Sequence, residues 1–252
     1  MSEYKYPRGN KMTNTNGYLL IGDIHSQFAP LKKAWDYACE NNLRPILLGD
    51  VFDSRCEVSN TVDVYRLLKY MQKHGDAVIL RSNHQDKLEM FSLGIPCHQP
   101  VEMLRTADEF EAAGIELLEV NEWLQTMPYG FVFRDHENTE FRCAHAFFPS
   151  WLQIPDYIGS IEVRPTQKQV RKLMLYGPPL SEGKGRALWW LNASKKREWV
   201  RVGGHYHTIY RDSKSLLLDG GCGGLKRSWF CSEAPILVAY DSLKKQMIEI
   251  EC

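Results

Sequence analysis

The sequence predicts an α/β fold, with a sheet that is buried on both faces. Three apolar runs, at 18–23, 45–50 and 77–82, are short and continuous, which is typical of strands buried on both faces. Each run is followed by a segment whose apolar residues recur at helical spacing. This alternation of strands and helices in the first third of the chain is the basis for predicting the α/β class.

Helices are expected after each of these strands. The first spans about 30–40 and places Leu31 and Trp35 on one face, and the next two span about 61–74 and 83–91. The second half of the chain contains further apolar runs, which predict strands at 130–135, 140–146, 199–205, 215–221 and 236–241.

The length and charge of the chain favour one domain without a general preference for a charged partner. At 252 residues the chain is long enough to bury a large core, and we expect a single domain over 1–252. The 31 Lys and Arg residues balance 31 Asp and Glu residues, so the net charge does not point to nucleic acid or an anionic membrane.

The cysteines and the N-terminal residues bear on location. The 7 cysteines are odd in number and form no Cys-x-x-Cys pair, which fits reduced thiols in the cytosol better than a disulfide framework. The first 17 residues are polar and lack the apolar core of a secretion signal, and no stretch approaches the roughly 20 apolar residues of a membrane span. We expect a soluble, cytoplasmic protein that does not enter membranes, and we make no prediction of its oligomeric state.

Two segments depart from the charge balance. The segment at about 94–122 has seven acidic residues and one basic residue from 102 onward, and we expect an exposed helical insert or a lid. The segment at about 166–201 holds nine basic against two acidic residues, together with three tryptophans. It is interpreted either as ordinary surface over buried tryptophans, or as a rim that binds the bases and phosphates of a nucleic-acid end.

Polar side chains follow five of the predicted strands, at the points where the strands end. In an open α/β sheet the carboxyl ends of the strands meet at one edge, so we expect these side chains to converge. Carboxylates, an amide and imidazoles are ligands that suit paired divalent metals, although each motif alone is a weak signal and Asn83 or His145 could be an ordinary capping or core residue. The residues are Asp23, His25, Asp50, Asp53, Asn83, His84, His145, His205 and His207.

These motifs resemble, in the same order, the signature of the calcineurin-like metallophosphoesterases: GDIH at 22–25, GDVFD at 49–53, SNHQ at 82–85, CAHA at 143–146 and GHYH at 204–207. LLLDGGCGG at 216–224 is similar to the segment that closes the site in the Ser/Thr-phosphatase-type branch, which includes bacterial and phage phosphatases and dinucleoside tetraphosphatases. The resemblance implies two packed mixed β-sheets flanked by helices. Ser26 and Ser82 stand where the family has glycine, and Gln85 replaces an acid.

The resemblance also implies two divalent metal ions. Manganese is our first expectation, and the residue types do not separate it from iron, zinc or nickel. Two cations about 3.5–4 Å apart would lower the pKa of a shared water, hold the phosphoryl oxygens and stabilise charge during in-line attack. One ion would be bound by Asp23, His25, Asp50 and His207, and the other by Asp50, Asn83, His145 and His205.

The remaining roles implied by the resemblance concern the leaving group and the phosphate. His84 would protonate the leaving group, with Asp53 holding its ring. Arg55 lies one position later than the arginine of the family motif, and it could bind the phosphate or simply face solvent. A second phosphate-binding arginine is expected, and the sequence does not choose among Arg164, Arg171 and Arg186.

Three functions follow as hypotheses. The first is a dimetal phosphomonoesterase that acts on a phosphoprotein, a nucleotide or a nucleic-acid end, and it is the one we expect. The second is a phosphodiesterase or dinucleoside polyphosphate hydrolase that uses the same site. The third is a non-catalytic binding module on the same fold. Loss of a metal ligand or of His84 would indicate such a module, and the sequence retains His84 and every expected ligand.

Overall fold

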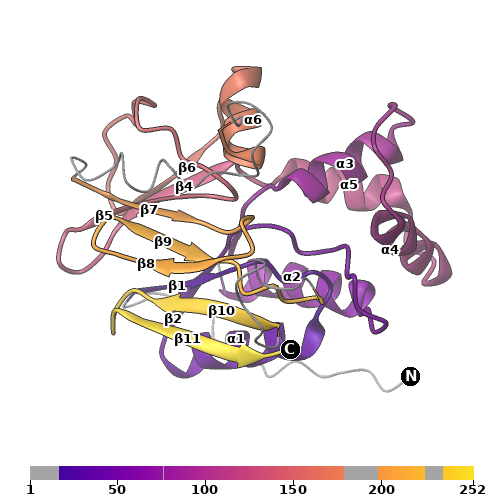
Figure 1. Ribbon diagram of the computed structural model, residues 1–252, viewed down its shortest axis with the longest axis horizontal. Helices are drawn as coiled ribbons and strands as arrows, with labels where there is room; N and C mark the ends of the chain where they lie inside the picture. The colour runs from indigo at the N-terminus through magenta and orange to yellow at the C-terminus, as the bar shows by residue number, and fades with distance from the viewer. Residues whose placement is uncertain (1–16, 76, 179–197, 225–234) are drawn as a thin grey trace.

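Two β-sheets pack face to face, with helices on their outer sides (Figure 1). This computed structural model describes residues 17–75, 77–178, 198–224 and 235–252. The predicted α/β class with two mixed sheets is confirmed.

The first sheet has the strand order β11-β10-β1-β2-β3. Its first three strands along the chain are parallel and correspond to the three predicted apolar runs, although they end a few residues earlier than expected. The polar residues that follow therefore lie beyond the strands, in loops after β1 and β2 and at the start of the helix after β3. The bounds are β1 Gly17–Ile21, β2 Leu43–Leu47, β3 Val78–Ile79, β10 Ile236–Asp241 and β11 Gln246–Glu251.

The second sheet has the order β6-β4-β5-β7-β9-β8. Within it β5, β7 and β9 are mutually parallel, so their carboxyl ends reach the same edge. The bounds are β4 Gly130–Arg134, β5 Glu140–Ala144, β6 Ser160–Val163, β7 Val200–Gly203, β8 Ile209–Arg211 and β9 Ser215–Leu218.

Side chains alternate across the first sheet as the strand period requires. Leu19 and Ile21 of β1 pack on the helix side, whereas Leu20 packs with residues of the second sheet such as Phe131 and Leu216. The continuous apolar run of β1 thus serves two cores, one on each face. This is why the sequence shows no polar alternation there.

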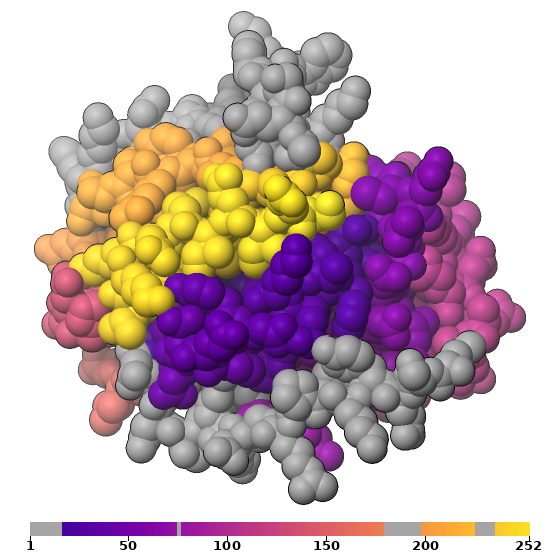
Figure 2. All heavy atoms as spheres, turned by 90° about the horizontal axis from the view of Figure 1, so that it is seen from below, coloured from indigo at the N-terminus to yellow at the C-terminus, as the bar shows by residue number. Residues whose placement is uncertain are grey.

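The helices cover the outer faces and one side of the two sheets. α1 (Phe28–Glu40) and α2 (Thr61–Gly75) pack on the first sheet, and α6 (Lys168–Tyr176) packs on the second. α3 (Asn83–Ser92), α4 (Val101–Ala112) and α5 (Leu117–Gln125) form a group at one side (Figure 1). Figure 2 shows the earliest described residues, in indigo, lying beside the yellow C-terminal strands, and within the first sheet β1 pairs with β10.

The two charged segments can be placed only in part. The acidic segment forms α4 and most of α5, and it packs Met103, Phe110 and Val120 into the core below its charged surface. Of the basic segment, α6 and the start of β7 are described, and Trp199 is buried. The stretch 179–197, with the other two tryptophans, lies outside the described residues. No helix in the described part of the chain has the length and hydropathy of a membrane span.

Gly22 marks a place where the two sheets touch through backbone alone. Its N–H donates to the carbonyl of Val238 at 2.9 Å, and a Cβ at this position would lie 1.8 Å from the carbonyl oxygen of Leu218. Any side chain here would push β9 away from the first sheet.

We therefore predict that Gly22→Ala lowers the free energy of unfolding by about 3 kcal/mol, the upper range for overpacking. Urea unfolding followed by circular dichroism measures it. Gly94→Ala is the matched control, because a Cβ there meets nothing within 4 Å and only the left-handed backbone (φ +66°) opposes it, at about 1–2 kcal/mol. Equal losses in the two variants would contradict this account of the sheet contact.

Candidate metal centre

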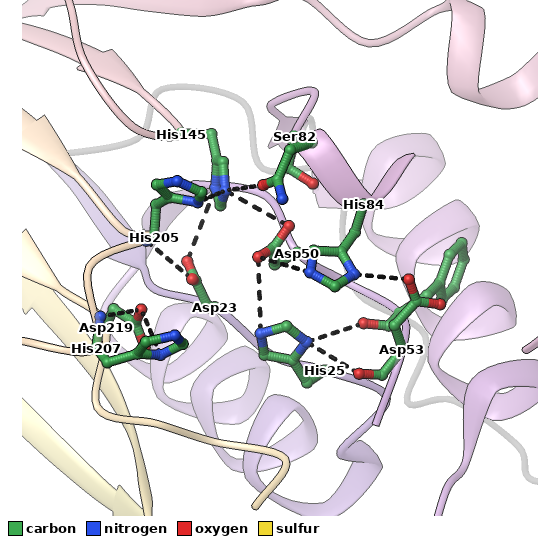
Figure 3. Close-up of polar contacts among 12 residues, drawn as sticks. Asp23, His25, Asp50, Asp53, Ser82, His84, His145, His205, His207 and Asp219 are labelled. Carbon is green, nitrogen blue, oxygen red and sulfur yellow. Dashed lines mark hydrogen bonds and ion pairs between the residues drawn. The ribbon is translucent and has the colours of Figure 1, made fainter. Parts of the chain in front are cut away.

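Six of the seven expected metal ligands lie together where the strands of both sheets end (Figure 3). Loops after β1 and β2 supply three of them, loops after β5 and β7 supply two, and the first residue of α3 is the sixth. All six are at most 5% exposed, so they form a buried polar group. We call this group the donor cluster: Asp23, His25, Asp50, Asn83, His145 and His205.

Asp50 lies at the middle of the donor cluster. Its Oδ2 is 3.7 Å from His25 Nε2, and its Oδ1 is 3.5 Å from His145 Nε2. Two sets of side chains share it, and within each set the possible ligand atoms lie within 4.8 Å of one another: Asp23 with His25 and Asp50, and Asp50 with His145 and His205. One carboxylate therefore lies between two sets of donors.

The second set is held together around His145. Its Nε2 lies 2.8 Å from Asn83 Oδ1 and 3.0 Å from His205 Nδ1. Its Nδ1 lies 3.1 Å from the carbonyl oxygen of Leu48, and because a carbonyl only accepts, Nδ1 carries the hydrogen. The lone pair of Nε2 is then directed into the donor cluster.

The same tautomer follows for His25. Its Nδ1 lies 3.1 Å from the carbonyl oxygens of both Phe52 and Asp53 and donates to them, which leaves Nε2 unprotonated and facing Asp50. Burial lowers the pKa of His25 and likewise the pKa of His145. Both rings are therefore neutral at pH 7, which is the form that binds metals.

Several ligand atoms of the donor cluster are buried without a hydrogen bond. Within the described residues, Asp23 Oδ1, His25 Nε2 and Asp50 Oδ1 have no such partner. Leaving a buried polar atom unsatisfied costs about 1–3 kcal/mol. Burial, followed by the neighbouring carboxylates of Asp219 and Asp50, also holds the pKa of Asp23 well above its ordinary value. A divalent cation would satisfy these donors and offset the crowding of carboxylates, so the residues present fit a metal.

His207 does not join the donor cluster. Its side chain is 35% exposed, and its Nδ1 lies 3.3 Å from Asp219 Oδ2, which also accepts from the His207 backbone N–H at 2.6 Å. The pair lies at the margin of the cluster, beside Asp23 (Figure 3). Sequence reasoning missed Asp219, which is fully buried, although an Asp at the end of an apolar strand is the same signal that singled out Asp23 and Asp50.

Gly204 explains the Gly-Gly pair that precedes His205. A Cβ at Gly204 would lie 2.0 Å from Asp23 Oδ1. The backbone N–H of His205 donates to the other oxygen of that carboxylate at 2.9 Å. The loop after β7 therefore lies directly against Asp23, and only glycine fits at this contact.

His84 and Asp53 form the expected pair next to the donor cluster. His84 Nδ1 lies 2.7 Å from Asp53 Oδ2, and its Nε2 lies 3.8 Å from Asp50 Oδ2 (Figure 3). Burial acts to lower the pKa of His84, but Asp50 and Asp53 outweigh it, so the pKa lies above the ordinary value. A histidine whose protonated form is favoured in this way, with Nε2 facing the cluster, has the arrangement that a general acid needs.

The contacts of the candidate arginines do not identify which of them binds the phosphate. Arg55 is about half exposed, and its Nε lies 3.3 Å from Glu102 of α4. Arg164 donates to the carbonyl of Met127 at 3.3 Å, and with Arg171 it lines a cavity of about 370 Å³ beside α3. Arg186 lies outside the described residues. The second phosphate-binding arginine therefore stays unassigned.

Two of the departures from the family signature have local structural roles. Ser82 is the N-cap of α3, and its side chain accepts from the backbone N–H of Gln85. Ser26 Oγ lies 2.9 Å from Thr61 Oγ1 at the start of α2. Neither serine displaces a member of the donor cluster.

Left-handed backbone is concentrated at the site. Among the described residues, nine other than glycine have positive φ, and five of these are expected site residues. Such conformations are uncommon for residues with a side chain and persist where the surroundings enforce them. The five are His25 (φ 47°), Asp50 (φ 42°), Asp53 (φ 67°), His205 (φ 68°) and His207 (φ 48°).

Comparison with known proteins bears on the fold and the family of the chain. The structure of a putative diadenosine tetraphosphatase is similar over 94% of this chain and 98% of its own, with a TM-score of 0.59 and 17% identity. A protein serine/threonine phosphatase from Saccharomyces cerevisiae is similar over 97% of this chain and 85% of its own, with a TM-score of 0.52 and 11% identity. At these identities the likeness concerns the fold, and no curated protein sequence matched the chain. The model of the calcineurin-like phosphoesterase family matches residues 18–225, and the chain belongs to that family.

Proposed function

We propose that this protein is a dimetal-dependent phosphomonoesterase whose substrate is a phosphoprotein, a nucleotide or a nucleic-acid end. The observation that carries the proposal is the shared position of Asp50, whose carboxylate lies between two buried sets of possible metal ligands. Manganese is the first candidate metal. The proposed ligands are Asp23, His25, Asp50 and His207 for one ion, and Asp50, Asn83, His145 and His205 for the other.

The assignment is better supported for the six residues of the donor cluster than for His207. His207 is included because of the family motif, since in the structure it contacts Asp219 rather than the cluster. Asp219 would orient His207 by accepting from its Nδ1, a common arrangement for metal-binding histidines.

Two divalent ions bound at the donor cluster would supply a water of lowered pKa and positive charge for the phosphoryl oxygens. The chain itself supplies the proton for the leaving group. His84 Nδ1 is held by Asp53 at 2.7 Å, so its Nε2–H is directed towards Asp50 and the space where the ester would lie. Transfer of that proton to the leaving oxygen avoids the release of a free alkoxide. Arg55 is a further candidate to bind the phosphate.

A phosphodiesterase or dinucleoside polyphosphate hydrolase would use the same donors, and one protein of similar fold is described as a putative diadenosine tetraphosphatase. A binding module without activity is less well supported, because the donor cluster, His84 and Asp53 are all in place. A cytoplasmic location, suggested by the cysteine content, is part of the same proposal.

With manganese we expect p-nitrophenyl phosphate to be hydrolysed faster than bis-p-nitrophenyl phosphate and diadenosine tetraphosphate. Phosphopeptides and oligonucleotides with 5′- or 3′-phosphates, assayed in the same panel by released phosphate, would then identify the class of monoester. Preference for either of the two diester-type substrates would replace the proposal with its alternative.

Asp50→Asn should abolish turnover and reduce bound manganese below two ions per chain, because it weakens the one carboxylate shared by both donor sets. Elemental analysis of the purified protein and a p-nitrophenyl phosphate assay measure the two effects. Asp36→Asn, at a surface carboxylate paired with Lys32, is the control and should change neither. Two bound ions with intact activity in the Asp50 variant would show that the site is assigned wrongly.

His84→Ala should lower kcat by about 10²–10⁴-fold on phenyl phosphate, the range for a lost general acid. The loss should be much smaller on p-nitrophenyl phosphate, whose leaving group departs without a proton. His136→Ala, at a partly exposed histidine, serves as the control. Equal losses on the two esters would show that His84 is not the general acid.

A further inference from the structure

One face of α4 contacts the loop that carries Asp53. Four polar residues at helical spacing form this face, and we call them the α4 stripe: Glu102, Arg105, Thr106 and Glu109. Each of them contacts a residue between 53 and 61, about 50 positions earlier in the chain. The segment that the sequence presents as an acidic insert is therefore attached to the edge of the candidate centre.

Three members of the α4 stripe fix the course of the loop. Glu102 pairs with Arg55 at 3.3 Å, and Glu109 accepts from the backbone N–H of Thr61 at 3.0 Å. Arg105 donates to the carbonyl of Cys56 at 2.6 Å and also to the carbonyl of Glu57. These contacts are with Arg55 or with the loop backbone, and all of them lie beyond Asp53 along the chain.

Thr106 differs, because it contacts Asp53 itself. Its Oγ1 donates to Asp53 Oδ1 at 2.8 Å and accepts from the Asp53 backbone N–H at 3.2 Å. Thr106 is 1% exposed and Asp53 is 2% exposed, so water does not substitute for either bond. Asp53 also has left-handed backbone (φ 67°), and the hydroxyl holds both the backbone and the side chain of this residue.

The two oxygens of Asp53 are thereby given separate partners. Oδ1 accepts from Thr106, and Oδ2 lies 2.7 Å from His84 Nδ1. The bond at one oxygen opposes rotation of the carboxylate about its bond to Cβ, which keeps the other oxygen on the imidazole. Without the hydroxyl, Oδ1 would be buried and unsatisfied, and the carboxylate would turn towards another donor.

We propose that Thr106 is a positioning residue for the leaving-group acid: it fixes the Asp53 carboxylate, which in turn fixes the ring of His84. This inference rests on the proposed function, because the acid role of His84 belongs to it. The hydrogen bonds of the Thr106 hydroxyl are both with Asp53, which is not a member of the donor cluster. Its contribution to turnover should therefore depend on how much the leaving group needs a proton.

Thr106→Val removes the hydroxyl and keeps the shape of the side chain. We expect kcat on phenyl phosphate to fall by about 10–100-fold, the range for outer partners of a functional histidine, and kcat on p-nitrophenyl phosphate to fall much less. Bound manganese should stay at the wild-type level. Thr106→Ser, which retains the hydroxyl, should recover most of the loss. Equal losses on the two esters, or no recovery with serine, would overturn the proposal.

Two comparisons separate positioning from a general loss of structure. Arg105→Gln breaks the same helix–loop attachment without touching Asp53, so it should lower stability and affect both esters alike. In a His84→Ala background, Thr106→Val should cause no further loss on phenyl phosphate, because the residue through which it acts is already gone. An additive loss in that double variant would show that Thr106 acts elsewhere.

A readout that needs no turnover keeps this inference distinct from the proposed function. In protein loaded with diamagnetic zinc, which avoids the line broadening that manganese causes, the hydrogen-bonded Nδ1 proton of His84 should give a downfield proton NMR signal, assigned by its absence in His84→Ala. We expect the signal to be lost in Thr106→Val and retained in Thr106→Ser and Arg105→Gln. If wild-type protein hydrolysed neither ester, the proposed function would fail, and this signal would still decide whether Thr106 fixes the pair. Its persistence in Thr106→Val would refute the positioning role.

Discussion

The burial of carboxylates among histidines, at the edge where both sheets end, is the constraint on which the rest of this structure depends. Asp23, Asp50 and Asp219 each follow a strand and each is almost completely buried. Charged groups are buried at high cost unless they are paired or bind a metal, and the raised pKa of Asp23 is a direct result of its burial and of the two neighbouring acids. The surrounding loops, caps and helices hold these groups together against that cost.

Much of the fold and of the donor cluster could be predicted because both follow from short-range patterns. The runs that end in Asp23 and Asp50 predict buried strands, and parallel strands place their carboxyl ends together. The contact of His207 with Asp219, and of Arg55 with Glu102, could not be predicted in this way. Each depends on how a loop bends or on which face of a distant helix meets it, and neither is encoded in the spacing of residues nearby.

Several residues of the site have strained backbone conformations. Left-handed conformations at residues with side chains cost of the order of 1–3 kcal/mol each, and His25, Asp50, Asp53 and His205 all adopt them. Compensation comes from outside the cluster as well: the carbonyls of Phe52 and Asp53 hold the ring of His25, and Thr106 of α4 bonds to both the backbone and the side chain of Asp53. Helices that contribute no donor to the cluster, α4 above all, are therefore part of what makes it rigid.

The position of β10 has a consequence for how the protein is made. This strand lies between β1 and β11, and its Val238 accepts from Gly22, more than 200 residues earlier. At the usual synthesis rate of about 5–20 residues per second, roughly 10–40 s pass between the emergence of β1 and that of β10. During this interval β1 has an unpaired edge that another nascent chain could join. Completion of the first sheet, and with it the final placement of the loop after β1, thus comes long after β1 is made, and production at low temperature or with a chaperone that shields strand edges should raise the yield of folded protein.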